Sequence, residues 1–88
     1  MNALDILKQP HSKEDERDIS QIRQYIVSDP QIMDGLPVFA GTRIPVYIIL
    51  DYFAEGLGIE DILKDYPGLD RDKIRMALKF ANLVTSIH

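Results

Sequence analysis

The sequence predicts a mainly α-helical fold, in which a three-helix bundle with the outline of a helix-turn-helix follows a short two-stranded β element and an N-terminal helical extension. Three observations support this prediction. Apolar residues recur at helical spacing in three segments after residue 45, glycine or proline separates these segments, and two short β-prone runs precede them. Because a chain of 88 residues forms one small core, we expect an extension over residues 1–24 and a single domain over residues 25–88.

Charged residues dominate positions 8–18 of the N-terminal extension. Ser12 followed three residues later by Asp15 is typical of a helix start. Ile19, Ile22 and Ile26 then recur at spacings of three and four residues and form a narrow apolar stripe. The extension is therefore either a solvated, partly disordered leader or a helix that docks on a partner chain.

Two short runs with β propensity follow, Tyr25-Ile26-Val27 and Pro37-Val38-Phe39, with the turn-forming pair Asp34-Gly35 between them. They predict the two-stranded element. A block that begins Gly41-Thr42-Arg43 then joins the second strand to the bundle. Gly41 permits a positive φ, and Thr42 can accept an N–H from the start of the next helix. Arg43 either pairs with a nearby carboxylate or faces phosphate.

Glycine and proline bound three predicted helices. The first runs from Val46 to Glu55, is apolar almost all round, and is expected to be the central core helix, with Gly56 as its left-handed cap. The second is short and amphipathic, and the third begins at the N-cap Asp70. The apolar positions of these two helices are Ile59, Ile62, Leu63 and Tyr66, and an inner stripe of Ile74, Ala77, Leu78 and Ala81.

The third helix concentrates the positive charge of an otherwise acidic chain. Residues 70–88 carry a net charge of +2, against −6 for residues 1–69. Three basic side chains follow one another at i, i+4 spacing on one face, with an asparagine beside them. Because such side chains read base edges and contact phosphate, the face is either a DNA-binding surface or an ordinary solvated face. The candidate DNA-binding residues are Arg71, Arg75, Lys79 and Asn82, with Arg43 from the preceding joint.

The same helix carries a second apolar stripe beside the inner one. Together the two stripes cover about 220° of the helix surface, whereas one small core needs little more than about 100°. We expect the surplus to be buried against the N-terminal helix, a second copy of the chain or a different protein, and we favour a partner interface and a homodimer. The candidate interface residues are Met76, Phe80, Leu83 and Ile87, with Ile19 and Ile22.

The sequence offers no residue pattern for catalysis, metal binding or a cofactor. His11 and His88 lie near the two ends, without metal-ligand spacing to another histidine or to paired carboxylates. Asp61 and Asp65, one helical turn apart, fit a solvated face better than a Mg²⁺ site. The chain has no cysteine, no membrane-length apolar stretch and no signal-peptide pattern. We therefore predict a cytoplasmic, non-enzymatic protein without a cofactor or a small-molecule substrate.

An ordered set of short motifs resembles a bacterial family, the domain of unknown function 433 (DUF433). Its most specific piece is the block 41–46, followed at fixed distance by residues 60–63 and by Tyr66-Pro67. Over about residues 25–82, the other matching positions are Asp29-Pro30, Gly35, Pro37-Val38, Gly56, Ile59, Leu69, Ile74 and Ala77-Leu78. Some members of the family are described as VapB-like antitoxins. The resemblance implies a homeodomain-like helix-turn-helix and an antitoxin that binds its operator DNA and a PIN-like ribonuclease toxin.

Two functional hypotheses follow. The first is a dimeric, DNA-binding regulator of antitoxin type that reads an operator through the basic face of the third helix. The second is a protein-interaction module that binds a partner through its apolar stripe and does not touch DNA. They differ in the substitution that matters, because Arg75→Glu should abolish function in the first case and Phe80→Asp in the second.

Overall fold

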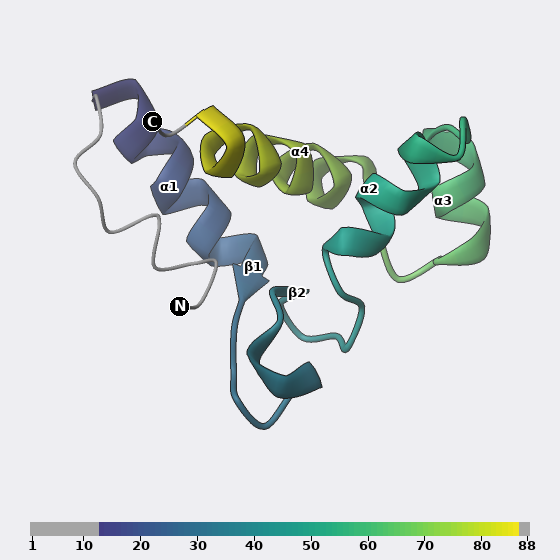
Figure 1. Ribbon diagram of the computed structural model, residues 1–88, viewed down its shortest axis with the longest axis horizontal. Coiled ribbons are helices and arrows are strands. Elements are labelled where there is room, and N and C mark those ends of the chain that lie inside the picture. The colour runs from purple at the N-terminus through teal and green to yellow at the C-terminus, as the bar shows by residue number, and fades with distance from the viewer. Residues whose placement is uncertain (1–12, 87–88) are drawn as a thin grey trace.

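The computed structural model describes residues 13–86, and within them the chain is mainly helical (Figure 1). The helices are α1 (Lys13–Tyr25), the short 3-10 helix η2 (Met33–Gly35), α2 (Tyr47–Ala54), α3 (Ile59–Asp65) and α4 (Arg71–Ser86). The strands are β1 (Ile26–Val27) and β2 (Val38–Phe39), which pair antiparallel. A mainly α-helical fold with a short two-stranded element after an N-terminal helix is therefore confirmed.

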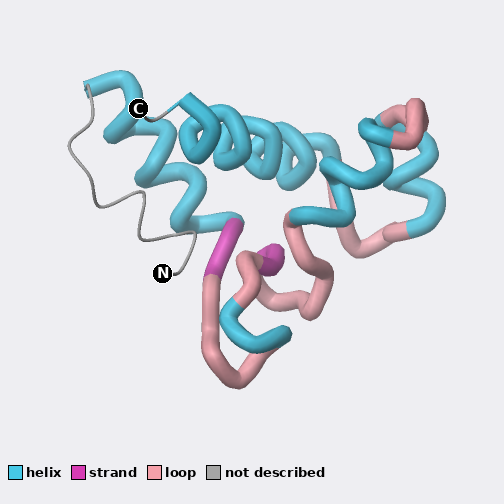
Figure 2. Tube along the Cα trace, viewed as in Figure 1, coloured by secondary structure: helices cyan, strands magenta, loops and turns pink. Residues whose placement is uncertain are grey.

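The core lies where α4 packs between α1 on one side and the α2–α3 pair on the other (Figure 2). Ile22 of α1, Ile62 of α3 and Ile74 of α4 are each completely buried in one continuous apolar cluster. Because these three side chains come from both flanks and from the centre, α4 is the element that holds the domain together. The prediction that the helix after residue 45 occupies the centre is wrong.

Helix α1 docks on α4 of its own chain, and Figure 1 shows the two helices side by side. Ile19 and Ile22 are its buried residues, and Lys79 of α4 donates from Nζ to Oδ1 of Asp18 over 2.9 Å. Ile26 lies beyond the helix in β1, where it is buried as well. The predicted helix start at Ser12 lies outside the described residues.

The two strands pair with Ile26 opposite Phe39 and Val27 opposite Val38. The chain between them turns through Asp34 and Gly35, which have φ of 56° and 85°. The Ser28 hydroxyl donates a hydrogen bond to the Gly35 carbonyl and closes this connection. The turn predicted at Asp34-Gly35 is confirmed, because both residues adopt the left-handed conformation that asparagine, aspartate and glycine tolerate best.

The joint after β2 is a tight turn that folds the chain back on the strand. Gly41 has φ of 76°, and the Thr42 hydroxyl donates to the Phe39 carbonyl over 2.8 Å and accepts the Ile44 N–H over 3.0 Å. The Phe39 N–H in turn donates to the Ile44 carbonyl over 3.0 Å. The role of this block is therefore to build the turn, and the helix starts at Tyr47, later than the sequence predicts.

Helix α2 buries only Ile49 completely, while Tyr47, Leu50 and Phe53 are 48%, 41% and 36% exposed. Apolarity all round the helix therefore does not place it at the centre of the fold. It lies at the edge of the domain with one side on α3 and α4 (Figure 1). Gly56, with φ of 82°, ends the helix in the left-handed conformation as predicted.

Two aspartates fix the starts of the last two helices. The Gly58 N–H donates to Oδ2 of Asp61 over 2.8 Å at the start of α3. Asp70 accepts the Lys73 N–H at its Oδ1 over 2.8 Å, which confirms Asp70 as the N-cap of α4. No helix in the described part of the chain is long and apolar enough to cross a bilayer.

Candidate interaction surfaces

The predicted basic residues of α4 do share one accessible face. Arg71, Arg75 and Asn82 are exposed, and Lys79 is partly buried against α1. Arg43 is exposed as well, but it lies in the turn after β2. Sequence spacing therefore placed the four α4 residues correctly relative to one another.

Each basic side chain of this face is paired with a carboxylate inside the chain. Arg71 pairs with Glu60 of α3, Arg75 lies 3.4 Å from Asp72 on α4, and Lys79 binds Asp18 of α1. The two arginine pairs are exposed and contribute about 0–1 kcal/mol each, so phosphate can displace them. The positive charge is nevertheless compensated locally, which sequence spacing did not reveal because Glu60 and Asp18 come from other helices.

The predicted partner interface on α4 is already covered by the chain itself. Met76, Phe80 and Leu83 are 2%, 5% and 4% exposed, because α1 places Ile19 and Ile22 against that side of the helix. This corrects the assignment of all five residues to a partner surface. Of the alternatives that the sequence left open, burial against the N-terminal helix is the one found. Ile87 lies outside the described residues.

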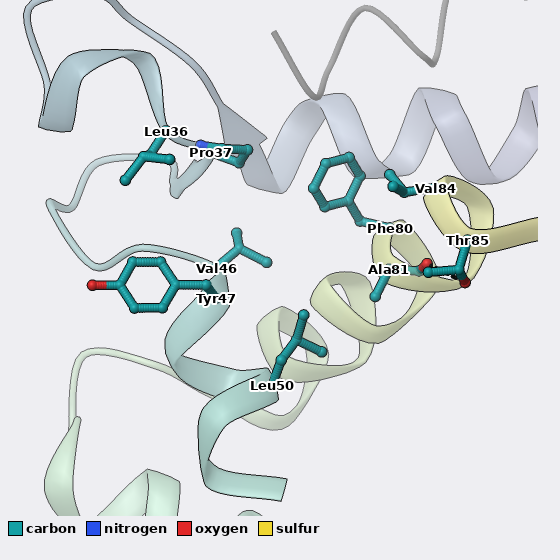
Figure 3. Close-up of a pocket in the computed structure, with 9 residues that line it drawn as sticks. All are labelled: Leu36, Pro37, Val46, Tyr47, Leu50, Phe80, Ala81, Val84 and Thr85. Atoms are coloured by element: carbon teal, nitrogen blue, oxygen red, sulfur yellow. Dashed lines mark hydrogen bonds between the residues drawn. The ribbon is translucent and has the colours of Figure 1, made fainter. Parts of the chain in front are cut away.

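A groove opens along α4 next to the side that α1 covers, between this helix, the start of α2 and the segment before β2 (Figure 3). Its volume is about 180 Å³. Phe80, Ala81, Val84 and Thr85 of α4 form one wall, and Leu36, Pro37, Val46, Tyr47 and Leu50 form the other. The lining includes no carboxylate, amine, imidazole or thiol, so the groove offers apolar burial to a ligand.

The groove is lined by large apolar side chains that keep much of their surface in water. Leu36 is 45% exposed, and Tyr47 and Leu50 are about as exposed. Leu78, predicted on the inner stripe of α4, is 39% exposed and lies one helical turn from Ala81. This corrects its assignment to the core. The signal that could have located the groove is α2 itself, since a helix apolar on all sides beside a small core must leave apolar surface uncovered.

The acidic residues of α3 have structural partners. Asp61 caps its helix, and Oδ2 of Asp65 accepts the Tyr52 hydroxyl over 2.6 Å. The hydrogen bond to this carboxylate, with desolvation and the carboxylate's charge, raises the pKa of Tyr52 from 10.0 to about 12. Among residues 13–86 no three histidine or acidic side chains gather as metal ligands. His11 and His88 lie outside that range.

This chain is similar to known proteins in sequence and in fold. Residues 26–81 match the family described as "Protein of unknown function (DUF433)". The uncharacterized protein y4eO of Sinorhizobium fredii (strain NBRC 101917 / NGR234) is 41% identical over 64 residues, which are 73% of this chain. The chain spans only 29% of the length of that relative. The crystal structure of a DUF433 member from Anabaena variabilis ATCC 29413 has a similar fold, with a TM-score of 0.60 at 18% identity, over 94% of this chain and 93% of that one.

Proposed function

This chain belongs to the DUF433 family of proteins of unknown function, and we propose that it is a non-enzymatic, cytoplasmic domain that works by binding another protein chain. The observation that carries this proposal is the apolar groove between α2 and α4, where Tyr47 and Leu50 stay exposed. Side chains of this size, clustered around a depression, are typical of protein-binding surfaces. A volume of about 180 Å³ suits one or two inserted side chains better than a small-molecule substrate, whose pockets usually measure about 300–1,000 Å³.

The proposal is tested by capture with the full chain and two matched variants. Leu50→Asp places a charge in the groove, whereas Leu57→Asp places the same charge on a leucine of similar exposure, 43%, that does not line it. We expect the wild-type chain and Leu57→Asp to retain the same protein from a lysate, and Leu50→Asp to lose it. Equal retention by both variants would contradict a role for the groove. Phe80→Asp does not serve here, because a charge at this buried position would disrupt the core.

A specific observation favours a second function, the exposure of Arg71, Arg75 and Asn82 on one face of α4. We propose as this alternative the antitoxin-type regulator that the family resemblance implies, dimeric, with operator DNA and a PIN-like ribonuclease toxin as partners. Binding would require the arginines to exchange Glu60 and Asp72 for phosphate or base edges.

A gel-shift with the DNA upstream of the gene tests this alternative. We expect binding at low salt that weakens steeply as salt rises, and that Arg75→Glu abolishes. Arg23→Glu, an equal charge reversal on the exposed surface of α1, is the control and should bind nearly as well as the wild-type chain. If DNA is not retained at low salt, with or without the neighbouring toxin, the DNA-binding function is wrong.

A further inference from the structure

We propose that the outer face of α2 is a docking surface for a basic amphipathic helix of a different protein. This inference rests on the proposed protein-binding function and names the chemistry of the partner. Two observations carry it, the order of the exposed side chains around α2 and the free carboxylates at one edge of the face. The outer face consists of the exposed residues Tyr47, Leu50, Asp51, Phe53, Ala54 and Glu55.

The apolar part of this face and its acidic edge are adjacent. Successive residues of an α-helix are about 100° apart, which sets the order of the side chains around α2. With steps of about 20–60°, that order is Phe53, Leu50, Ala54, Tyr47, Asp51 and Glu55. Ile49, which is completely buried, lies outside this arc and packs on the core. A partner that covers Leu50 and Tyr47 therefore also meets the two carboxylates.

The two carboxylates of the outer face are free within the described chain. Asp51 and Glu55 form neither an ion pair nor a side-chain hydrogen bond among residues 13–86. By contrast, every acidic side chain of α3 already has a partner within the chain. Free negative charge beside exposed apolar side chains is complemented by lysine or arginine beside apolar residues. A basic amphipathic helix has this pattern.

A second copy of the chain offers no such helix among residues 13–86. In α4, Arg71 and Arg75 share a face with the exposed Leu78, but both arginines already pair with carboxylates of their own chain. The exposed side of α1 is polar and carries both signs of charge, with Lys13, Glu14, Glu16, Arg17, Ser20, Gln21, Arg23 and Gln24. A different protein with free basic side chains gains ion pairs without breaking any, so it fits the outer face of α2 better.

A designed peptide tests the chemistry of this surface. The probe is a peptide of about 18 residues with leucines at i, i+3, i+4 and i+7 and lysines elsewhere, and its counterpart has glutamate in place of lysine. Fluorescence anisotropy with the full chain should show binding of the leucine–lysine peptide only. Asp51→Lys/Glu55→Lys should weaken that binding by about 10-fold or more and should bind the leucine–glutamate peptide instead.

Two further variants separate this surface from general charge attraction. Glu14→Lys/Glu16→Lys makes the same change of charge on exposed residues of α1, and it should bind the leucine–lysine peptide nearly as tightly as the wild-type chain. Leu50→Asn removes an apolar contact without changing the charge and should weaken binding by about 10-fold or more. Circular dichroism checks that each variant folds. Equal weakening by the two charge reversals, or an affinity that Leu50→Asn leaves unchanged, would overturn the inference.

Capture from a lysate distinguishes this inference from the proposed function. If the captured protein depends on Leu50 but is retained by Asp51→Lys/Glu55→Lys, protein binding stands and the basic partner is wrong. If every variant retains it, the proposed function fails and the inference fails with it. Sedimentation equilibrium tests the remaining occupant, because a wild-type dimer that Asp51→Lys/Glu55→Lys dissociates would place a second copy on this face and overturn the inference.

Discussion

Nζ of Lys79 lies 2.9 Å from Oδ1 of Asp18, and this ion pair joins α4 to α1 across 61 positions of the chain. Both side chains are only 37% and 36% exposed, so the pair is better shielded from solvent than those of Arg71 and Arg75. It lies on the side of α4 that α1 covers. The pair thus joins the N-terminal helix to the rest of the domain.

Lys79→Gln should lower the free energy of unfolding by about 0.5–1 kcal/mol, because it removes a partly buried ion pair between two helices. Arg75→Gln is the matched control, since its pair with Asp72 is more exposed and lies within one helix. For Arg75→Gln we expect the free energy of unfolding to change by no more than about 0.5 kcal/mol. Urea unfolding measures both values. Equal losses of unfolding free energy at the two positions would show that the ion pair between α1 and α4 stabilises the fold no more than the exposed pair within α4.

Ile22→Ala should lower the free energy of unfolding far more than Lys79→Gln does. Ile22 is completely buried, so the truncation loses apolar burial and leaves a cavity, at a cost of about 2–5 kcal/mol. Arg23→Ala changes the adjacent exposed residue and should alter stability by no more than about 0.5 kcal/mol. Thermal unfolding followed by circular dichroism measures both. If Ile22→Ala lowers the stability no more than Arg23→Ala does, α1 does not dock on α4 in solution.

Gly41→Ala isolates the backbone requirement of the turn after β2. No heavy atom lies within 4 Å of a Cβ built at Gly41, so the substitution meets no steric contact, but its φ of 76° is strained for alanine. We expect a loss of about 1–2 kcal/mol. Gly68 is the control, because it has similarly open space and no positive φ. Gly68→Ala should be neutral or stabilising by up to about 1 kcal/mol in chemical denaturation, and a similar loss at both positions would contradict the role of φ.

Local features of this fold could be predicted from the sequence, because each depends on a few neighbouring residues. The cap at Asp70, the stop at Gly56 and the turn at Asp34-Gly35 are of this kind. A helical wheel likewise shows which residues share a face, as it did for Arg71 and Arg75. It does not show which face another helix covers, since that depends on contacts far apart in the chain.

This dependence on distant contacts explains why the predictions of which residues of α4 and α2 are buried were wrong. Phe80 and Leu78 both lie on apolar stripes of α4, yet α1 buries Phe80 while Leu78 stays exposed. Similarly, nothing in the local sequence of α2 says that Ile49 faces the core and Leu50 faces water. The candidate groove is made of such residues from three separate segments, so only the folded chain brings it together.

The Tyr52 hydroxyl should lose its proton at a higher pH than that of an ordinary tyrosine. Its hydroxyl donates to the Asp65 carboxylate, which favours the neutral phenol and raises its pKa from 10.0 to about 12. A pKa raised in the folded state means that the stabilising contribution is complete below pH 10 and is lost as the pH rises through about 12. Absorbance titration of the phenolate should therefore show one tyrosine that ionises late, and Asp65→Asn should return it toward 10.0 because the main cause is removed. Tyr52→Phe should remove the late step altogether. An unchanged titration in Asp65→Asn would mean that the hydrogen bond between α2 and α3 does not form in solution.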